Sequence, residues 1–190
     1  MTNALAERPP LAGTLTRQLG MQALNKAALE ALSQQQSLAV MTLDVDHFKP
    51  YQDEVGESQA AAALARLVAV LGQTLPGGTS VVHLGSDEFF VLLVGSDLAA
   101  AQSLAEQVRG AVEQGLAGTP AAPRLTVTVG VAASPAHGPW TGADLLGLAD
   151  MRMTFAKRRL TPHHNLVWAG TLPSDWHARL DIDPTRWPSL

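Results

Sequence analysis

The chain contains no cysteine among its 190 residues, which excludes disulfide bonds and metal sites built from thiolates. Basic residues are also few, with 13 Lys and Arg against 17 Asp and Glu, and they form no cluster. Broad binding to nucleic acid needs a surface rich in Lys and Arg, so the net charge of −4 argues against a nucleic-acid partner. Sites for hard metal ions, which are built from carboxylates, remain open.

Long apolar runs are missing as well. No uninterrupted apolar segment approaches the ~20 residues that cross a bilayer, and the first residues, MTNALAERPP, lack the cationic and apolar regions of a secretion signal. We therefore expect a cytoplasmic protein that does not enter a membrane. The hydrophobic fraction of 46% is enough for one domain with a buried core.

The stretch VVHLGSDEFFVLLV, residues 81–94, predicts a β-hairpin. Gly85-Ser86 is a turn pair typical of tight hairpins, and the apolar run after it is expected to form a strand covered on both faces. Asp87 and Glu88 lie where the hairpin re-enters the sheet. Two interpretations remain at this point: a cation neutralises these carboxylates, or they belong to a solvated acidic turn.

A second acidic pair follows the apolar run 38–43, which predicts a central strand. Asp44 and Asp46 share a face if the strand continues through both of them, and they diverge if it ends at Val45. A carboxylate at the end of a buried strand is a common metal ligand, and the alternative is that Asp46 caps a helix. Pro50 is expected to break or restart the chain just beyond.

The remaining patterns alternate between helix and strand. Apolar positions at helical spacing predict helices over 14–36, 58–75, 98–116 and 141–159. Ser96 or Asp97 is expected to cap the third helix, and Thr141 with Asp144 forms a capping box at the fourth. Strands are predicted at 125–132, where Leu or Val alternates with Thr as in a half-buried strand, and at an edge position, 165–168. This mixed order predicts an α/β fold of the α+β type, with helices covering a sheet.

We divide the chain into a lead-in of residues 1–10, a domain over residues 11–168 and an extension over residues 169–190. The extension carries Trp176 and Trp187 in a polar setting. Tryptophans in such a tail more often pack on their own domain than bind a partner.

The two acidic sites gain meaning when they are taken together. Each lies where a buried strand meets a turn, and neighbouring strands would bring them close enough to hold Mg²⁺ or Mn²⁺ through oxygen ligands. Lys49 and Lys157 are then candidate phosphate partners, because such ions are usually shared with a nucleoside triphosphate. For Lys157 the alternative is a favourable interaction with the dipole of its own helix.

The segments LDVDHFK (43–49) and LGSDEF (84–89) resemble the GGDEF domain of diguanylate cyclases. Residues 125–132 are similar to that family's late strand, and the pairs Ala149-Asp150 and Ala156-Lys157 to its last helix. The resemblance implies a central, mostly antiparallel, five-stranded sheet flanked by helices, as in nucleotidyl cyclases and polymerase palm domains. In that family each domain holds one GTP with divalent metal ions, and two domains meet face to face to form cyclic di-GMP.

The resemblance also implies a role for each matching residue. The metal ligands would be Asp44, the Val45 carbonyl, Asp87 and Glu88. Asp87 and Glu88 would also be the catalytic residues, with Glu88 assisting deprotonation. The substrate and its phosphates would be bound by Phe48, Lys49, Gln52, Gly85, Ser86 and Lys157.

Several matching positions depart from the family pattern. Ser86 replaces the second Gly of the motif, and a side chain there crowds the nucleotide or strains the turn. Gln52 and Ala61 stand where the family reads guanine with Asn and Asp, and Ala61 offers no hydrogen bond to a base. The family's inhibitory RxxD motif, which would run from Pro76 to Thr79, is absent.

Three functions follow from these matches and departures. The first is a divergent domain of cyclic-dinucleotide signalling that binds GTP or another purine nucleotide with Mg²⁺, is weak or inactive as a cyclase, and acts on a regulatory protein partner. The second is an active diguanylate cyclase, or one with relaxed purine choice, that works as a homodimer. The third is a pure protein-interaction module with the extension as its docking element.

Overall fold

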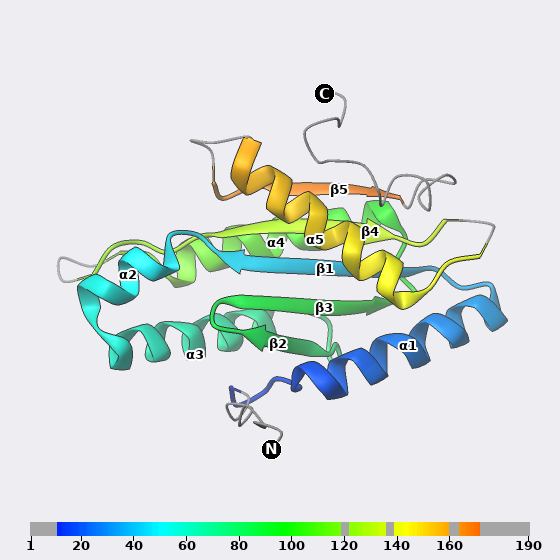
Figure 1. Ribbon diagram of the computed structural model, residues 1–190, viewed down its shortest axis with the longest axis horizontal. Helices are drawn as coiled ribbons and strands as arrows, with labels where there is room; N and C mark the ends of the chain where they lie inside the picture. The colour runs from blue at the N-terminus through cyan, green and yellow to red at the C-terminus, as the bar shows by residue number, and fades with distance from the viewer. Residues whose placement is uncertain (1–10, 119–121, 136–138, 160–163, 172–190) are drawn as a thin grey trace, which may run out of the picture.

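The computed structural model describes residues 11–118, 122–135, 139–159 and 164–171 of the protein (Figure 1). The predicted lead-in 1–10 lies outside these residues, as do Trp176 and Trp187. The described elements are, in chain order, α1 (Arg17–Gln34), β1 (Leu38–Val45), α2 (Phe48–Val55), α3 (Glu57–Thr74), β2 (Val81–Gly85), β3 (Glu88–Val94), α4 (Leu98–Gly115), β4 (Val127–Ala133), α5 (Gly142–Arg159) and β5 (Val167–Thr171). Among the described helices, none has the length and apolar character needed to cross a membrane.

The strands form one five-stranded sheet in the order β2-β3-β1-β4-β5. The central strand β1 pairs antiparallel with β3 and β4, and β2 pairs antiparallel with β3. Only the edge strand β5 runs parallel to its neighbour, β4. The predicted α+β class, the mostly antiparallel sheet and the final edge strand are therefore confirmed.

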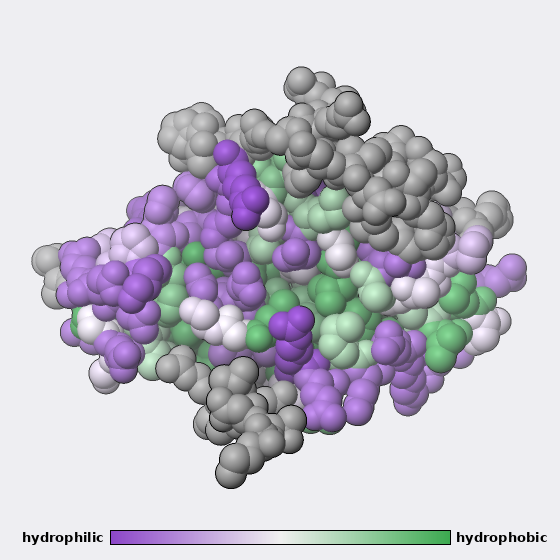
Figure 2. Space-filling model, in the orientation of Figure 1, coloured by the Kyte–Doolittle hydropathy of each residue, from purple (hydrophilic) through white to green (hydrophobic). Residues whose placement is uncertain are grey.

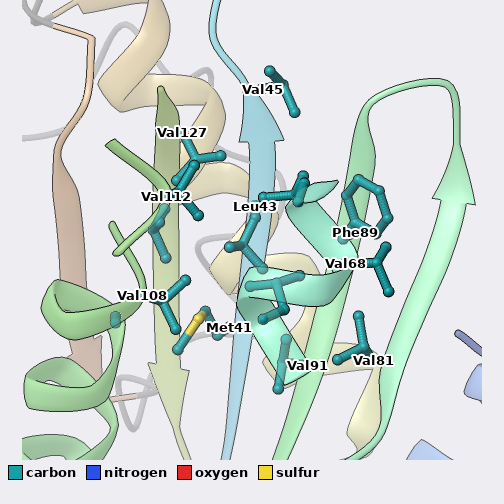
Figure 3. Packing of buried hydrophobic residues seen from close by; sticks show 14 of the residues in the cluster. Met41, Leu43, Val45, Val68, Val81, Phe89, Val91, Val108, Val112 and Val127 are labelled. Carbon is teal, nitrogen blue, oxygen red and sulfur yellow. The ribbon is translucent and has the colours of Figure 1, made fainter. Parts of the chain in front are cut away.

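Helices cover both faces of the sheet, so the central strands β3, β1 and β4 are buried on both sides. Figure 1 shows α1 and α5 on the near side of the sheet and α4 on the far side. Alternate residues of β1 divide between the two cores. Met41, Leu43 and Val45 pack with α3 and α4, as seen in Figure 3, whereas Leu38 and Val40 pack with α1 and α5. The half-buried Asp44 interrupts this apolar strand near its end.

The prediction that β4 is half-buried is wrong, because every residue of Val127–Ala133 is buried. The strand lies between β1 and β5, with α4 on one face and α5 on the other. Thr128, whose polarity indicated a solvent-facing position, is fully buried and donates a hydrogen bond to Asp46 at 2.7 Å. A buried hydroxyl with a carboxylate partner satisfies both groups.

The hairpin is confirmed, but its turn lies one residue later than predicted. Gly85 still pairs with Glu88, which leaves Ser86 and Asp87 as the turn. The register shifts between His83 and Gly85, so one residue of β2 has no partner on β3, as in a β-bulge. This extra residue moves the turn along the chain.

The chain beyond β1 forms a helix that the sequence did not predict. Pro50 lies in the first turn of α2, where its missing N–H removes no helical hydrogen bond. His47 is the N-cap residue, with φ of +56° and no side-chain cap hydrogen bond, so the alternative in which Asp46 caps a helix is wrong. Asp97 does cap α4 as predicted, accepting from the Ala100 N–H at 2.9 Å.

The edge strand β5 is tied to α5 by a buried arginine. Arg152 donates hydrogen bonds to the carbonyls of Val131 and Gly170, both at 2.7 Å, and of Thr171 at 3.0 Å. Burial lowers the pKa of Arg152 to about 10, which leaves the guanidinium charged at neutral pH. The capping box predicted at the start of this helix is confirmed, since the Thr141 N–H donates to Asp144 at 2.7 Å.

Candidate functional site

The two acidic pairs predicted from sequence meet at one end of the sheet. Asp44 on β1 lies opposite Glu88 on β3, and the Val45 N–H donates a hydrogen bond to the Asp87 carbonyl at 3.2 Å. Figure 1 shows this end on the left, where the arrowhead of β1, the β2–β3 turn and α2 lie near one another. The surface there, over α2, is mostly hydrophilic (Figure 2).

Lys157 reaches this site from the last turn of α5. Its Nζ hydrogen-bonds Asp44 Oδ1 and lies 3.4 Å from the Val45 carbonyl oxygen. The same ammonium is 3.8 Å from Asp46 Oδ1. The side chain is 20% exposed, so Lys157 is not a solvated charge at a helix end but part of the acidic site.

Asp46 is the most enclosed carboxylate of the site, with a side chain 1% exposed. It accepts hydrogen bonds from the hydroxyls of Thr126 and Thr128, both at 2.7 Å, and from the Asn165 N–H at 2.9 Å. The strand ends at Val45, and divergence of the two aspartates was expected in that case. Both carboxylates nevertheless approach Lys157, because the chain turns directly after the strand.

The environment of Asp44 disfavours its charged form. The pKa of Asp44 is raised from its usual 3.8 to about 6, chiefly because the carboxyl group is buried. The nearby charges of Asp87 and Glu88 contribute to the increase, and Lys157 opposes it. Such a cluster of carboxylates is stabilised by a cation. Perturbed carboxyl groups of this kind are more frequent at functional sites than elsewhere.

The donor groups at this end of the sheet fit Mg²⁺ or Mn²⁺. Carboxylate and carbonyl oxygens are the ligands that such hard ions prefer, and Asp44, Asp87, Glu88 and the Val45 carbonyl supply them. Across the described parts of the chain, no three His, Cys, Asp or Glu side chains already form a metal-binding group. Mg²⁺ keeps several waters and takes further oxygens from phosphates, so two or three protein ligands are enough.

The hairpin turn carries a strained residue and an open surface. Ser86 has φ of +48°, a left-handed conformation that costs a non-glycine residue about 1 kcal/mol. His83, which sequence analysis missed, stacks on Phe89 with ring centroids 4.8 Å apart, and its Nε2 lies 3.1 Å from the Ser86 carbonyl. A Cβ placed on Gly85 would meet no atom within 4 Å, so the turn leaves room for a ligand.

Other predicted site residues lie at α2 and α3, and the structure does not bring all of them to the carboxylates. Phe48 is buried and stacks on Tyr51, so its side chain belongs to the core. Lys49 is exposed, and its ammonium is paired with Asp53 on the same helix at 2.6 Å. Gln52 is half-buried on α2.

The chain matches the family model of the diguanylate cyclase GGDEF domain over residues 9–161. It is 31% identical over 141 residues to the diguanylate cyclase TpbB of Pseudomonas aeruginosa, which covers 72% of this chain and 32% of TpbB. It is 30% identical over 115 residues to the probable diguanylate cyclase DgcT of Escherichia coli K12, which covers 60% of this chain and 25% of DgcT. The chain thus spans about a quarter to a third of these curated relatives.

Solved structures share the same arrangement of helices and strands. The GGDEF domain of Pseudomonas aeruginosa TpbB superposes with a TM-score of 0.75 at 25% identity, covering 92% of this chain and 99% of that domain. The diguanylate cyclase SiaD of the same species, solved in complex with its activator SiaC, gives a TM-score of 0.75 at 25% identity and covers 86% of this chain and 61% of SiaD.

Proposed function

Because the chain belongs to the GGDEF family of diguanylate cyclase domains, we propose that it is a divergent member that binds a purine nucleoside triphosphate and is weak or inactive as a cyclase. The nucleotide binds with Mg²⁺ or Mn²⁺ at the end of β1. In this role the domain acts within cyclic-dinucleotide signalling by presenting a bound nucleotide to a regulatory protein partner. The complex of the similar diguanylate cyclase SiaD with its activator SiaC gives a precedent for a protein partner of a related enzyme.

The observation that carries this proposal is the placement of Asp44 opposite Glu88, with Lys157 beside them. The carboxylates and the Val45 carbonyl hold the metal ion, which when bound neutralises phosphate charge. Lys157 binds the terminal phosphate. The first N–H groups of α2 and the open turn at Ser86 are free to face the remaining phosphates.

Recognition of the base is weaker than recognition of the phosphates. Ala61 lies exposed on α3 and presents only a methyl group, which neither donates nor accepts a hydrogen bond. A missing buried partner typically costs ~1–3 kcal/mol, so the base is held loosely. Joining two nucleotides needs each to be held in a reactive orientation, and a loosely held base lowers the rate.

A second function, an active cyclase with relaxed purine choice, is favoured by one observation. Asp44 lies opposite Glu88 and is hydrogen-bonded by Lys157, which supports a site where carboxylates hold a metal ion beside an ammonium that binds phosphate. In this case two copies of the chain meet face to face, and each contributes one nucleotide. The products then contain adenine as well as guanine, because Ala61 does not select between them.

The deciding experiment incubates the purified protein with GTP, with ATP and with both, in Mg²⁺ or Mn²⁺, and analyses the products by mass spectrometry. Thermal melting in the same solutions reports binding without turnover. A melting shift without product supports the proposed binding role, and a cyclic dinucleotide supports the second function. If the folded protein shows neither a melting shift nor a cyclic product, both functions are refuted and the protein-interaction module remains.

A further inference from the structure

One ammonium group lies between two carboxylates at the end of β1. Lys157 Nζ hydrogen-bonds Asp44 Oδ1 and lies 3.8 Å from Asp46 Oδ1. The side chains of Lys157 and Asp44 are 20% and 17% exposed, so the pair is largely shielded from solvent. In this position Lys157 occupies one of the two Asp44 oxygens and places a positive charge where a metal ion would approach the carboxylate.

The two carboxylates are held very differently. Asp46 accepts from Thr126, Thr128 and the Asn165 N–H. Thr126 immediately precedes β4, Thr128 lies on β4, and Asn165 lies just before β5. Within the described residues, Lys157 is the side chain that hydrogen-bonds Asp44. Asp46 is therefore fixed, whereas Asp44 exchanges its partner when Lys157 moves.

We propose that Lys157 is the internal counter-ion of Asp44 and must leave it before a divalent cation binds, and that Asp46 is the positioning residue that keeps the displaced ammonium in the site. This inference rests on the proposed function, which assigns Asp44 to the metal ion and Lys157 to the terminal phosphate. The order of events is that Lys157 first leaves Asp44 and the metal ion then binds to the freed carboxylate.

The displacement couples binding of the metal ion to binding of the nucleotide. A lysine side chain is flexible and its ammonium makes hydrogen bonds in several directions, so it can move from Asp44 toward Asp46. A metal ion that arrives alone takes Asp44 from Lys157 and supplies no new acceptor. A metal–nucleotide complex supplies its terminal phosphate to the released ammonium. The metal ion and the nucleotide therefore raise each other's affinity, as linkage requires.

The test measures Mn²⁺ binding without nucleotide, by electron paramagnetic resonance of the free ion, in the wild type and in Lys157→Met. We expect Lys157→Met to bind Mn²⁺ alone about tenfold more tightly, since a competing charge-assisted hydrogen bond is gone. GTP should raise Mn²⁺ affinity in the wild type and much less in the variant. Equal Mn²⁺ affinity in the two proteins would overturn the proposal.

Lys26→Met is the matched control, because it removes the same charge and side-chain length from an exposed lysine on α1 that is paired with Glu30. We expect it to change Mn²⁺ affinity less than about twofold, as for a screened surface charge. An increase equal to that of Lys157→Met would mean that net charge, not displacement from Asp44, sets the affinity, and would also overturn the proposal.

The role of Asp46 is tested by a double-mutant cycle. Asp46→Asn should weaken Mn²⁺ binding in the wild type and have little effect in Lys157→Met, because Asp46 acts through Lys157. Equal weakening in both backgrounds would show that Asp46 acts on the ion by its own charge. If Asp46→Asn does not melt cooperatively, Thr126→Val replaces it, with a smaller effect in the same direction.

Failure of the proposed function would look different. Asp44→Asn would then leave the binding of Mn²⁺ and GTP unchanged. If Asp44→Asn abolishes their binding while Lys157→Met leaves Mn²⁺ affinity at the wild-type value, the nucleotide site stands and the counter-ion role of Lys157 is refuted.

Discussion

Asp44 of β1 and Glu88 of β3 lie directly opposite each other across the central pair of strands. Like charges in this relationship destabilise a sheet, and the burial of Asp44 adds to the cost. The Lys157 ammonium offsets part of that cost by its hydrogen bond to Asp44. Acidic residues kept together at the end of a buried strand, against the preference of the fold, are expected where a protein binds a divalent cation.

The stability of the metal-free protein should depend on pH through Asp44. Its pKa is raised from 3.8 to about 6, so the folded protein binds this proton more tightly than the unfolded chain does. Ionisation therefore destabilises the fold as the pH rises from 3.8 to about 6, by an amount on the order of 2 kcal/mol. Urea unfolding in EDTA should show the wild type losing stability relative to Asp44→Asn across this range. A constant difference between the two proteins would contradict the raised pKa.

Saturating Mg²⁺ and GTP should raise the melting temperature, because a ligand at a hundred times its Kd stabilises a folded protein by about 2.7 kcal/mol. Asp87→Asn should abolish this shift and any cyclic product, since the metal ion loses a carboxylate. Asp53→Asn is the control, because Asp53 is an exposed acid on α2 whose partner is Lys49. A full ligand-induced rise in the melting temperature of Asp87→Asn would show that Asp87 does not bind the metal ion.

Ser86 should limit nucleotide binding through the conformation of its turn. Ser86→Gly relieves the left-handed strain at φ of +48° and opens space over the phosphates, so we expect nucleotide affinity to rise a few-fold. Ser86→Val should lower the free energy of unfolding by ~1–2 kcal/mol, since a β-branched residue adopts this conformation poorly. Nucleotide titration and urea unfolding measure the two effects. A Ser86→Gly protein with wild-type affinity would show that the turn does not constrain the ligand.

Local patterns predicted the sheet well because its strands are short apolar runs. The run at 38–43 and the hairpin at 81–94 are bounded by charge and by glycine, and the structure confirms both, with the hairpin turn one residue later than predicted. The α2 helix was missed because Pro50 suggests a break, although a proline in the first turn of a helix is tolerated.

Contacts between residues that are far apart in the chain could not be predicted from the sequence alone. Thr126 and Thr128 form an alternating pattern that is typical of a half-buried strand, and no local signal ties them to Asp46, which lies 80 residues away from Thr126. The pairing of Lys157 with Asp44 spans 113 residues and depends on where α5 crosses the sheet. Site residues could be proposed from motif spacing, but their mutual contacts required the fold.

Base selectivity should be recoverable by substitution. Ala61 is exposed on α3, so Ala61→Asp is tolerated by the fold and supplies an acceptor for the N–H groups of guanine. Combined with Gln52→Asn, it should favour GTP over ATP by roughly 5- to 150-fold, the equivalent of ~1–3 kcal/mol. Competitive titration of the two nucleotides measures this ratio, and ATP affinity serves as the control. An unchanged ratio would place the base away from α2 and α3.

Arg152 should stabilise the acidic site from a distance by holding β5. Its guanidinium satisfies carbonyls of Val131, Gly170 and Thr171, and loss of a buried charged donor leaves these acceptors unpaired. Arg152→Met should therefore lower the free energy of unfolding by ~2–4 kcal/mol.

The consequence for the site follows from the chain between α5 and β5. The Asn165 N–H, just before β5, donates to Asp46, so a loosened β5 weakens the enclosure of that carboxylate. Gly170→Ala provides a second test, because a Cβ there would lie 2.5 Å from the Arg152 guanidinium and displace it. Both variants should show faster amide exchange at Asn165 than the wild type. If the variants are destabilised but amide exchange at Asn165 is unchanged, then Arg152 stabilises β5 without affecting the geometry of Asp46.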